Sequence, residues 1–234
     1  MRHLTVLLAS LLLTSFLHAA DTWQQVRNPA ARDEVKVWVK PVPGQALKAF
    51  KGVVDVPHSM LTALAVLGDI PRFPEWVFQC DSARALSDLG HDINYVHIKG
   101  IWPVADRDVV TRTTLEQDPQ TLAITAHTVA ADGLYPEKEG TVRLPALDNR
   151  FIFEPLPDGW TRITFETFAN PGGFIPGWLA NLVAVDAPLD TLEGMSELMR
   201  EDQYQVTSYK QLSMSFASLA TMQFPPGPAG ASAQ

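Results

Sequence analysis

The chain has 234 residues, of which 46% are apolar and 19% are charged. This length and composition suffice for one globular domain with a sizeable core. The 18 basic residues are outnumbered by 26 acidic ones, which gives a formal net charge of −8. An acidic chain argues against a nucleic-acid partner and against a polybasic membrane-binding patch.

The first twenty residues have the layout of a secretory signal peptide. One arginine precedes an apolar run from Leu4 to Leu17, and small residues follow the run. The run is too short to span a membrane comfortably. We therefore expect a signal peptide over residues 1–20, cleaved near Ala20, and a periplasmic or secreted mature protein. Its single cysteine, Cys80, has no internal disulfide partner, and a buried inert thiol is expected there.

The residues after this leader predict strands, then helices, then strands again. Glu34–Gly44 and Ala46–Val56 alternate apolar and polar residues, as two strands around a Pro-Gly turn do. A helix is expected after Pro57, followed by a short helix or turn that ends at Trp76. Short connections with turn residues favour antiparallel hairpins from there on. The strand candidates are residues 83–89, 92–102, 108–118, 120–129, 139–145, 149–156 and 159–168.

A long amphipathic helix is predicted near the end of the chain. Apolar residues recur every three or four positions from Ile175 to Arg200, and Pro188 is expected to kink or divide this helix. The periodicity fades after Tyr204. We therefore place one domain at residues 21–205 and a C-terminal extension at 206–234, which ends in a disordered tail from Phe224.

This order of elements describes an α+β domain. A twisted antiparallel sheet of such length curls, and the long C-terminal helix is the element available to fill the curve. Space left between the sheet and the helix is expected to form an internal hydrophobic cavity, which is the first place to look for function.

Three segments carry a family resemblance. They are WPVADRD at residues 102–108, PEKEGTVR at 136–143 and GGFIPGWLAN at 172–181. With Trp76, their order and spacing make the chain similar to START (steroidogenic-acute-regulatory-related lipid transfer) domains from about Glu34 to about Arg200. The resemblance implies a helix-grip fold whose tunnel holds one sterol, phospholipid or other apolar molecule. It also implies a protein that moves or presents lipids, as members of this family are not generally enzymes. We expect no catalytic residue, metal or cofactor.

Strand alternation predicts which side chains face the cavity. On each strand the less charged set is assigned to the helix side, because successive residues point to opposite faces. Asn94 and Thr113 are then the few polar groups inside, and either ligand contact or bonding within the core would satisfy them. The charged pair that some family members place there is missing, which disfavours a ligand that needs an ionic anchor. The predicted ligand-binding residues are Asn94, Val96, Ile98, Thr111, Thr113, Ile163, Phe165, Thr167, Leu179, Leu182 and Val183.

The trio Asp106-Arg107-Asp108 admits a catalytic or a structural interpretation. Both carboxylates would have to face one cavity for acid/base work, but adjacent strand residues face opposite sides. In the family that the chain resembles, these positions lie where one strand turns into the next. Arg107 is therefore expected to pin that corner with Asp106 or Asp108.

The preferred function is non-enzymatic binding and transfer of a hydrophobic ligand by a monomer that contacts membranes transiently. One alternative is a helix-grip enzyme, such as a cyclase, which would need more convergent polar groups in the cavity. Another is an interaction module that uses the segment after Tyr204. The histidines show no metal-ligand spacing, and no nucleophile elbow or phosphate-binding loop is present in the sequence.

Overall fold

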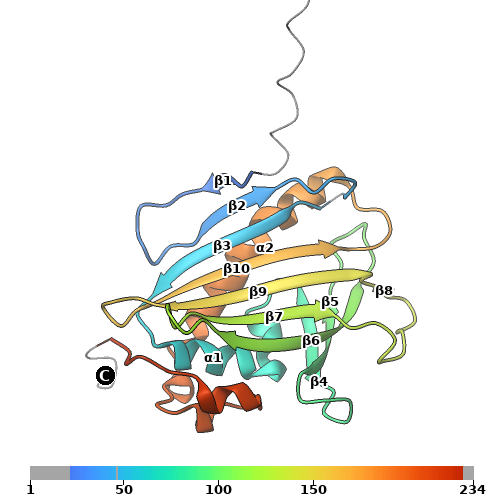
Figure 1. Cartoon of the computed structure of the whole chain (residues 1–234). Coiled ribbons are helices and arrows are strands. Elements are labelled where there is room, and N and C mark those ends of the chain that lie inside the picture. Colours follow the sequence, from blue (N-terminus) through green and yellow to red (C-terminus); the bar gives the residue numbers. More distant parts are fainter. Residues whose placement is uncertain (1–21, 46, 229–234) are drawn as a thin grey trace, which may run out of the picture.

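The computed structural model describes residues 22–45 and 47–228. The expected signal peptide lies outside the described residues. Ten strands form one sheet, in the order β1-β2-β3-β10-β9-β7-β6-β5-β4, and β8 pairs with β6 in parallel while the other pairings are antiparallel (Figure 1). The strands are β1 Gln24–Arg27, β2 Lys36–Lys40, β3 Ala49–Val56, β4 Cys80–Ala85, β5 Ile93–Ile98, β6 Arg107–Gln117, β7 Ile124–Ala130, β8 Val142–Arg143, β9 Ala146–Pro155 and β10 Thr161–Asn170.

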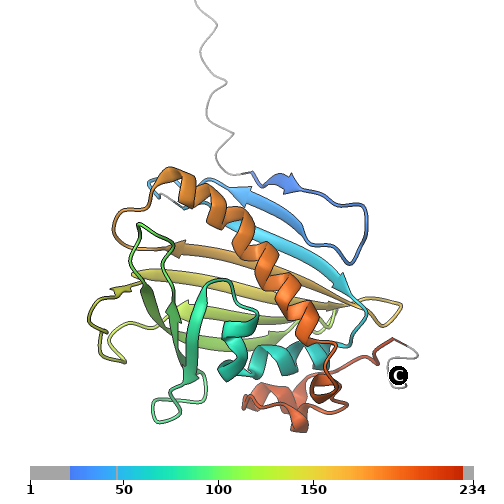
Figure 2. The ribbon, with the colours of Figure 1, turned by 180° about the vertical axis from the view of Figure 1, so that it is seen from behind.

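One face of this sheet is crossed diagonally by α2, Gly177–Leu198 (Figure 2). The curved sheet and the helix that it grips confirm the predicted α+β fold. The shorter α1, Met60–Gly68, and the 3-10 helix η1, Ile70–Glu75, lie at one end of the sheet. Ser59 caps α1, because its hydroxyl accepts a hydrogen bond from the Thr62 amide at 3.2 Å.

The core lies between the sheet and α2. Along β10 the side chains of Ile163 and Phe165 are buried, whereas Arg162 is exposed on the opposite face. Phe153 from β9 and Leu192 from α2 are fully buried in the same cluster. The period-2 alternation in the sequence therefore corresponds to one face that packs on the helix and one that faces water.

Several local expectations need correction. Pro188 does not divide the helix, because α2 runs unbroken through it. The expected strand at residues 83–89 begins earlier, as β4, and the one at 139–145 shrinks to the two residues of β8. The edge strand β1 lies in a segment that the sequence pattern left as a polar lead-in.

The C-terminal extension packs against the domain. It follows the 3-10 helix η2, Asp202–Tyr204, and contains two more, η3 Tyr209–Gln211 and η4 Ala217–Thr221. Leu219 is buried in the main core, and Phe224 packs against that core although it begins the expected disordered tail. Residues 229–234 lie outside the described part.

Candidate functional site

A cavity of about 210 Å³ lies between the sheet and the N-terminal part of α2. Its wall is mostly apolar, with Phe50 and Phe165 from the sheet and Leu179, Val183 and Ala187 from the helix. At one end the lining residues come from two loops, Ile98–Ile101 with Val104 on one side and Pro171 with Ile175 on the other. An apolar space with few polar groups is the usual form of a small-molecule site.

The structure brings some of the predicted ligand-binding residues into this wall. Ile98, Phe165, Thr167, Leu179 and Val183 line the cavity. The other six, which do not, are Asn94, Val96, Thr111, Thr113, Ile163 and Leu182. Contact with a ligand stays a prediction for all eleven.

The five of them that lie on strands have the expected parity but do not line the cavity, and Leu182 lies on α2. Ile163 is in the main core, and Val96 packs in a smaller cluster with Cys80 and Val109. The two threonines bond within the sheet, since the Thr111 hydroxyl donates to the Asn94 carbonyl at 3.5 Å and the Thr113 and Thr128 hydroxyls lie 2.9 Å apart. Alternation gives the face of a strand, but the curvature of the sheet decides which part of that face remains uncovered.

Asn149 is a lining residue that the sequence prediction missed. It lies on β9 directly opposite Thr167 of β10, and both side chains line the cavity. Its alternation with Phe151 and Phe153 was the available signal, because residues two and four positions apart share a face. No hydrogen-bond partner within the described residues reaches Asn149 Oδ1 or Thr167 Oγ1, although both atoms are buried.

The corner at residues 106–108 is structural, but its pairing differs from the expected one. Arg107 is 7% exposed and bonds carbonyls instead of a carboxylate. Its guanidinium donates to the oxygens of Ala105 at 2.5 Å, Gly172 at 3.2 Å and Pro171 at 3.3 Å. Arg107 therefore ties the start of β6 to the loop before α2, next to the end of the cavity that these loops form.

Asp108 takes its ion pair from a distant segment. Its two carboxylate oxygens accept from Arg143 Nε at 2.8 Å and Nη2 at 3.1 Å, and Tyr95 donates to it at 3.2 Å. Burial raises the pKa of Asp108, but the hydrogen bonds and charge of Arg143, the hydrogen bond from Tyr95 and the charge of His97 together hold this pKa below its usual value. Asp106 faces elsewhere and accepts from the Gly100 amide at 2.8 Å.

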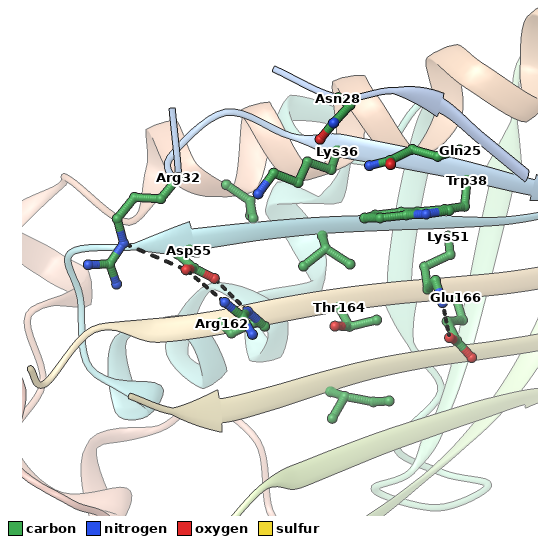
Figure 3. Close-up of a pocket in the computed structure, with 13 residues that line it drawn as sticks. Gln25, Asn28, Arg32, Lys36, Trp38, Lys51, Asp55, Arg162, Thr164 and Glu166 are labelled. Atoms are coloured by element: carbon green, nitrogen blue, oxygen red, sulfur yellow. Dashed lines mark hydrogen bonds and ion pairs between the residues drawn. The ribbon is translucent and has the colours of Figure 1, made fainter. Parts of the chain in front are cut away.

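A second, larger hollow of about 580 Å³ lies on the opposite face of the sheet (Figure 3). Its charged lining residues are four basic ones, Arg32, Lys36, Lys51 and Arg162, and two acidic ones, Asp55 and Glu166. Arg162 bonds Asp55 at 2.7 and 3.0 Å, Arg32 approaches the same carboxylate at 3.6 Å, and Lys51 lies 3.7 Å from Glu166. Three of the four basic side chains are therefore held in ion pairs. The apolar cavity is the stronger candidate site, because small-molecule sites are mostly apolar with few polar groups.

Three aromatic side chains project into solvent around the loops at the end of the cavity. Trp102 is 86% exposed, Phe174 is 83% exposed and Trp178 is 56% exposed. They alternate with lining residues, since Ile101 precedes Trp102, while Ile175 and Leu179 follow Phe174 and Trp178. Aromatic side chains that rim an apolar opening are typical of an interaction surface.

Other kinds of site find little support in the part of the chain that the structure describes. No group of three or more His, Cys, Asp or Glu residues there could hold a metal ion. Cys80 is buried, and burial, with Asp81 nearby, raises the pKa of its thiol to about 11. None of the described helices has the length and hydropathy needed to cross a bilayer.

A curved sheet closed over an apolar cavity by one long helix defines a helix-grip binding domain. The family model described as the START domain matches residues 7–200, and the chain belongs to this family. An uncharacterised protein of Pseudomonas aeruginosa is 34% identical over 193 residues, which cover 82% of this chain and 94% of that protein.

Solved structures and curated relatives agree with this assignment. The STAR-related lipid transfer protein of Xanthomonas axonopodis has a TM-score of 0.68 at 29% identity, covering 77% of this chain and all of that one. Human StAR-related lipid transfer protein 5 shares the fold, with a TM-score of 0.64 at 14% identity, covering 76% and 86%. Bovine phosphatidylcholine transfer protein is 26% identical over 109 residues, covering 45% of this chain and 51% of that protein.

Proposed function

We propose that this protein is a non-enzymatic carrier that binds one hydrophobic ligand, a lipid or sterol-like molecule, between the sheet and α2. The observation that carries the proposal is the apolar cavity at this place in a START domain. Transfer of each CH₂ group from water into such a cavity is favourable by about 0.8 kcal/mol. A carrier therefore removes most of the barrier that water imposes on a lipid leaving a membrane.

The composition of the cavity wall supports binding over catalysis. Among the lining residues the charged ones are Lys99 and Arg107, and the Arg107 guanidinium is bonded to three carbonyls. No carboxylate or imidazole is among these residues to act as a general base. A cyclase or similar enzyme would need such a group close to its substrate.

The size of the cavity bears on how a ligand enters. About 210 Å³ is below the roughly 300–1,000 Å³ of sites for drug-sized ligands. A whole lipid therefore requires the wall to open, and we propose that the loops with Trp102 and Phe174 separate while they contact a membrane.

The expected signal peptide makes the periplasm or the extracellular space the proposed location, which fractionation of cells that express the full chain would test.

The first test fills the cavity from the helix. Val183→Trp places an indole in the wall, and we expect it to reduce uptake of fluorescent phosphatidylcholine from vesicles by at least tenfold. Leu182→Trp is the matched control, because Leu182 is next to Val183 on α2 but its side chain does not line the cavity. Thermal unfolding of both variants checks that the fold is kept.

Native mass spectrometry of the mature wild-type protein, followed by organic extraction, would identify a ligand bound in the cell. A stoichiometric lipid that is present in Leu182→Trp and absent from Val183→Trp supports the carrier. If the two folded variants take up phosphatidylcholine equally, the ligand does not bind in this cavity.

A further inference from the structure

Two polar side chains in the cavity wall hold unused hydrogen-bonding capacity. Asn149 on β9 and Thr167 on β10 are directly paired in register, which places their Cβ atoms about 4.5–5.5 Å apart. Thr167 is only 7% exposed, and its hydroxyl and the Asn149 Oδ1 are both buried. Within residues 22–45 and 47–228, neither atom has a hydrogen-bond partner.

Two other polar side chains of the wall, Thr191 and Arg107, are already bonded to the protein. The Thr191 hydroxyl accepts from the Phe78 amide at 3.1 Å. Each nitrogen of the Arg107 guanidinium donates to a backbone carbonyl. Buried polar groups are nearly always paired, so two unpaired ones side by side in a ligand cavity indicate a place prepared for a polar atom.

The chemistry of the pair selects the kind of atom. Asn149 Oδ1 only accepts a hydrogen bond, while the Thr167 hydroxyl can donate as well as accept. One hydroxyl group satisfies both, because it donates to Asn149 and accepts from Thr167. An ester or ketone oxygen cannot donate to Asn149 Oδ1, and an anionic oxygen would be repelled by it.

The position of the pair indicates how the ligand lies. Along β10, Thr167 is four residues from Pro171, which corresponds to about 13 Å of extended strand. Pro171 belongs to the loop beside the exposed aromatic residues, whereas Thr167 is bordered by Phe165 and Phe50. A polar atom bound by this pair would therefore lie inside the cavity, and the apolar part of the ligand would extend toward the loops.

We propose that the ligand is an apolar molecule with an uncharged hydroxyl group, and that Asn149 and Thr167 bind this hydroxyl. This inference rests on the proposed carrier function and adds the class of ligand to it. Fatty alcohols and hydroxylated polycyclic lipids belong to this class, whereas a lipid whose sole polar group is ionised does not.

The test compares 1-dodecanol with dodecane, two probes of equal chain length that differ in one hydroxyl. Equilibrium dialysis with radiolabelled probes gives their dissociation constants for the mature wild-type protein and for Thr167→Val and Asn149→Leu. We expect each substitution to weaken dodecanol binding about tenfold and to change dodecane binding less than twofold. Thr164→Val is the control, because Thr164 lies on the same strand but lines the hollow on the opposite face.

Thermal unfolding adds a readout that separates recognition from structure. Thr167→Val removes a buried unpaired hydroxyl at nearly constant volume, so the ligand-free variant is expected to melt at the same or a higher temperature than wild type. Weaker dodecanol binding by a protein of undiminished stability would identify the hydroxyl as a ligand contact.

Three outcomes would overturn the inference. Equal affinity of wild type for both probes, unchanged by either substitution, would leave the carrier function intact and remove the hydroxyl contact. If the two variants lose affinity for dodecanol and dodecane to the same extent, these side chains shape the cavity without recognising a hydroxyl. Binding of neither probe by wild type would overturn the hydroxyl contact, and the carrier function would then be decided by the phosphatidylcholine uptake test alone.

Discussion

Asp108 shows how one buried charge holds two distant parts of the chain together. Its side chain is completely buried, and Arg143 reaches it from the segment just after the Pro136–Thr141 stretch. The expectation of a pinned corner at Asp106-Arg107-Asp108 was correct in kind, whereas the expected partner was wrong. The sequence offers an adjacent arginine, but adjacent strand residues face opposite ways, so Arg107 cannot reach the face on which Asp108 lies.

Replacement of Asp108 by Asn is expected to cost about 3–5 kcal/mol of unfolding free energy, because it removes the counter-ion of the largely buried Arg143 guanidinium. Urea unfolding measures this loss. Asp132→Asn is the control, since Asp132 is exposed in a turn and the change should stay within about 0.5 kcal/mol. A loss below 1 kcal/mol in Asp108→Asn would mean that water reaches Arg143 and replaces the carboxylate.

The same variant has a signature in its pH dependence. Because the folded-state pKa of Asp108 is lowered, its ion pair stabilises the protein above the unfolded pKa of about 3.9. That contribution is lost as pH falls from about 4 through the folded-state pKa. Wild type should therefore lose more stability than Asp108→Asn over this acid range.

Two glycines allow α2 to pack closely, one against the sheet and one against Trp76, which follows η1. A Cβ on Gly52 of β3 would lie 2.6 Å from a Leu192 methyl group and 3.0 Å from Pro188 Cβ. A Cβ on Gly194 of α2 would lie 2.8 Å from the Cα of Trp76. Pro188 packs directly against β3 within the unbroken helix.

Gly194→Ala therefore tests whether close packing or helix propensity determines the effect of an added methyl group on stability. In an exposed helix this change would stabilise by about 1 kcal/mol, but here the new methyl group meets a backbone atom. We expect a net loss of about 1–3 kcal/mol, measured by urea unfolding. Gly177→Ala, at the open start of the same helix where a Cβ meets nothing within 4 Å, should be neutral or stabilising. A stabilised Gly194→Ala would contradict the close packing of α2 on Trp76.

The molecule as a whole combines a negative charge with an apolar rim around the cavity. A net charge of −8 gives no general attraction to anionic lipids, so membrane contact would depend on Trp102, Phe174 and Trp178. Burying one such side chain is favourable by about 1.5–3 kcal/mol. These residues therefore can supply the transient membrane contact that a carrier needs.

The double variant Trp102→Ala/Phe174→Ala is expected to slow transfer of fluorescent phosphatidylcholine between neutral vesicles at least tenfold, because it removes most of the rim. The amount of probe bound at equilibrium should stay unchanged, since neither side chain lines the cavity. Leu89→Ala removes an exposed apolar residue elsewhere and should have no effect. Unchanged transfer rates in the double variant would place membrane contact on another surface.

Local patterns in the sequence were enough for the fold and the family. Alternation along β10 and the three-to-four spacing along α2 reflect side-chain direction within one element, which is a property of the backbone itself. The three START-like segments identified the domain because they occur in this chain in the order and spacing of START domains. Five of the eleven predicted binding residues line the cavity for the same local reason.

The remaining features depend on how elements far apart in the chain meet. Thr113 and Phe165 have similar alternation, yet only Phe165 lines the cavity, because the path of α2 and the curvature of the sheet leave uncovered only part of the inner face. The pairing of Asn149 with Thr167 arises from the register of β9 and β10. The pairing of Asp108 with Arg143 arises because a distant segment of the chain packs beside β6. Neither pairing is encoded by the local periodicity of the sequence. Periodicity tells which way a side chain points, whereas long-range packing decides what it meets.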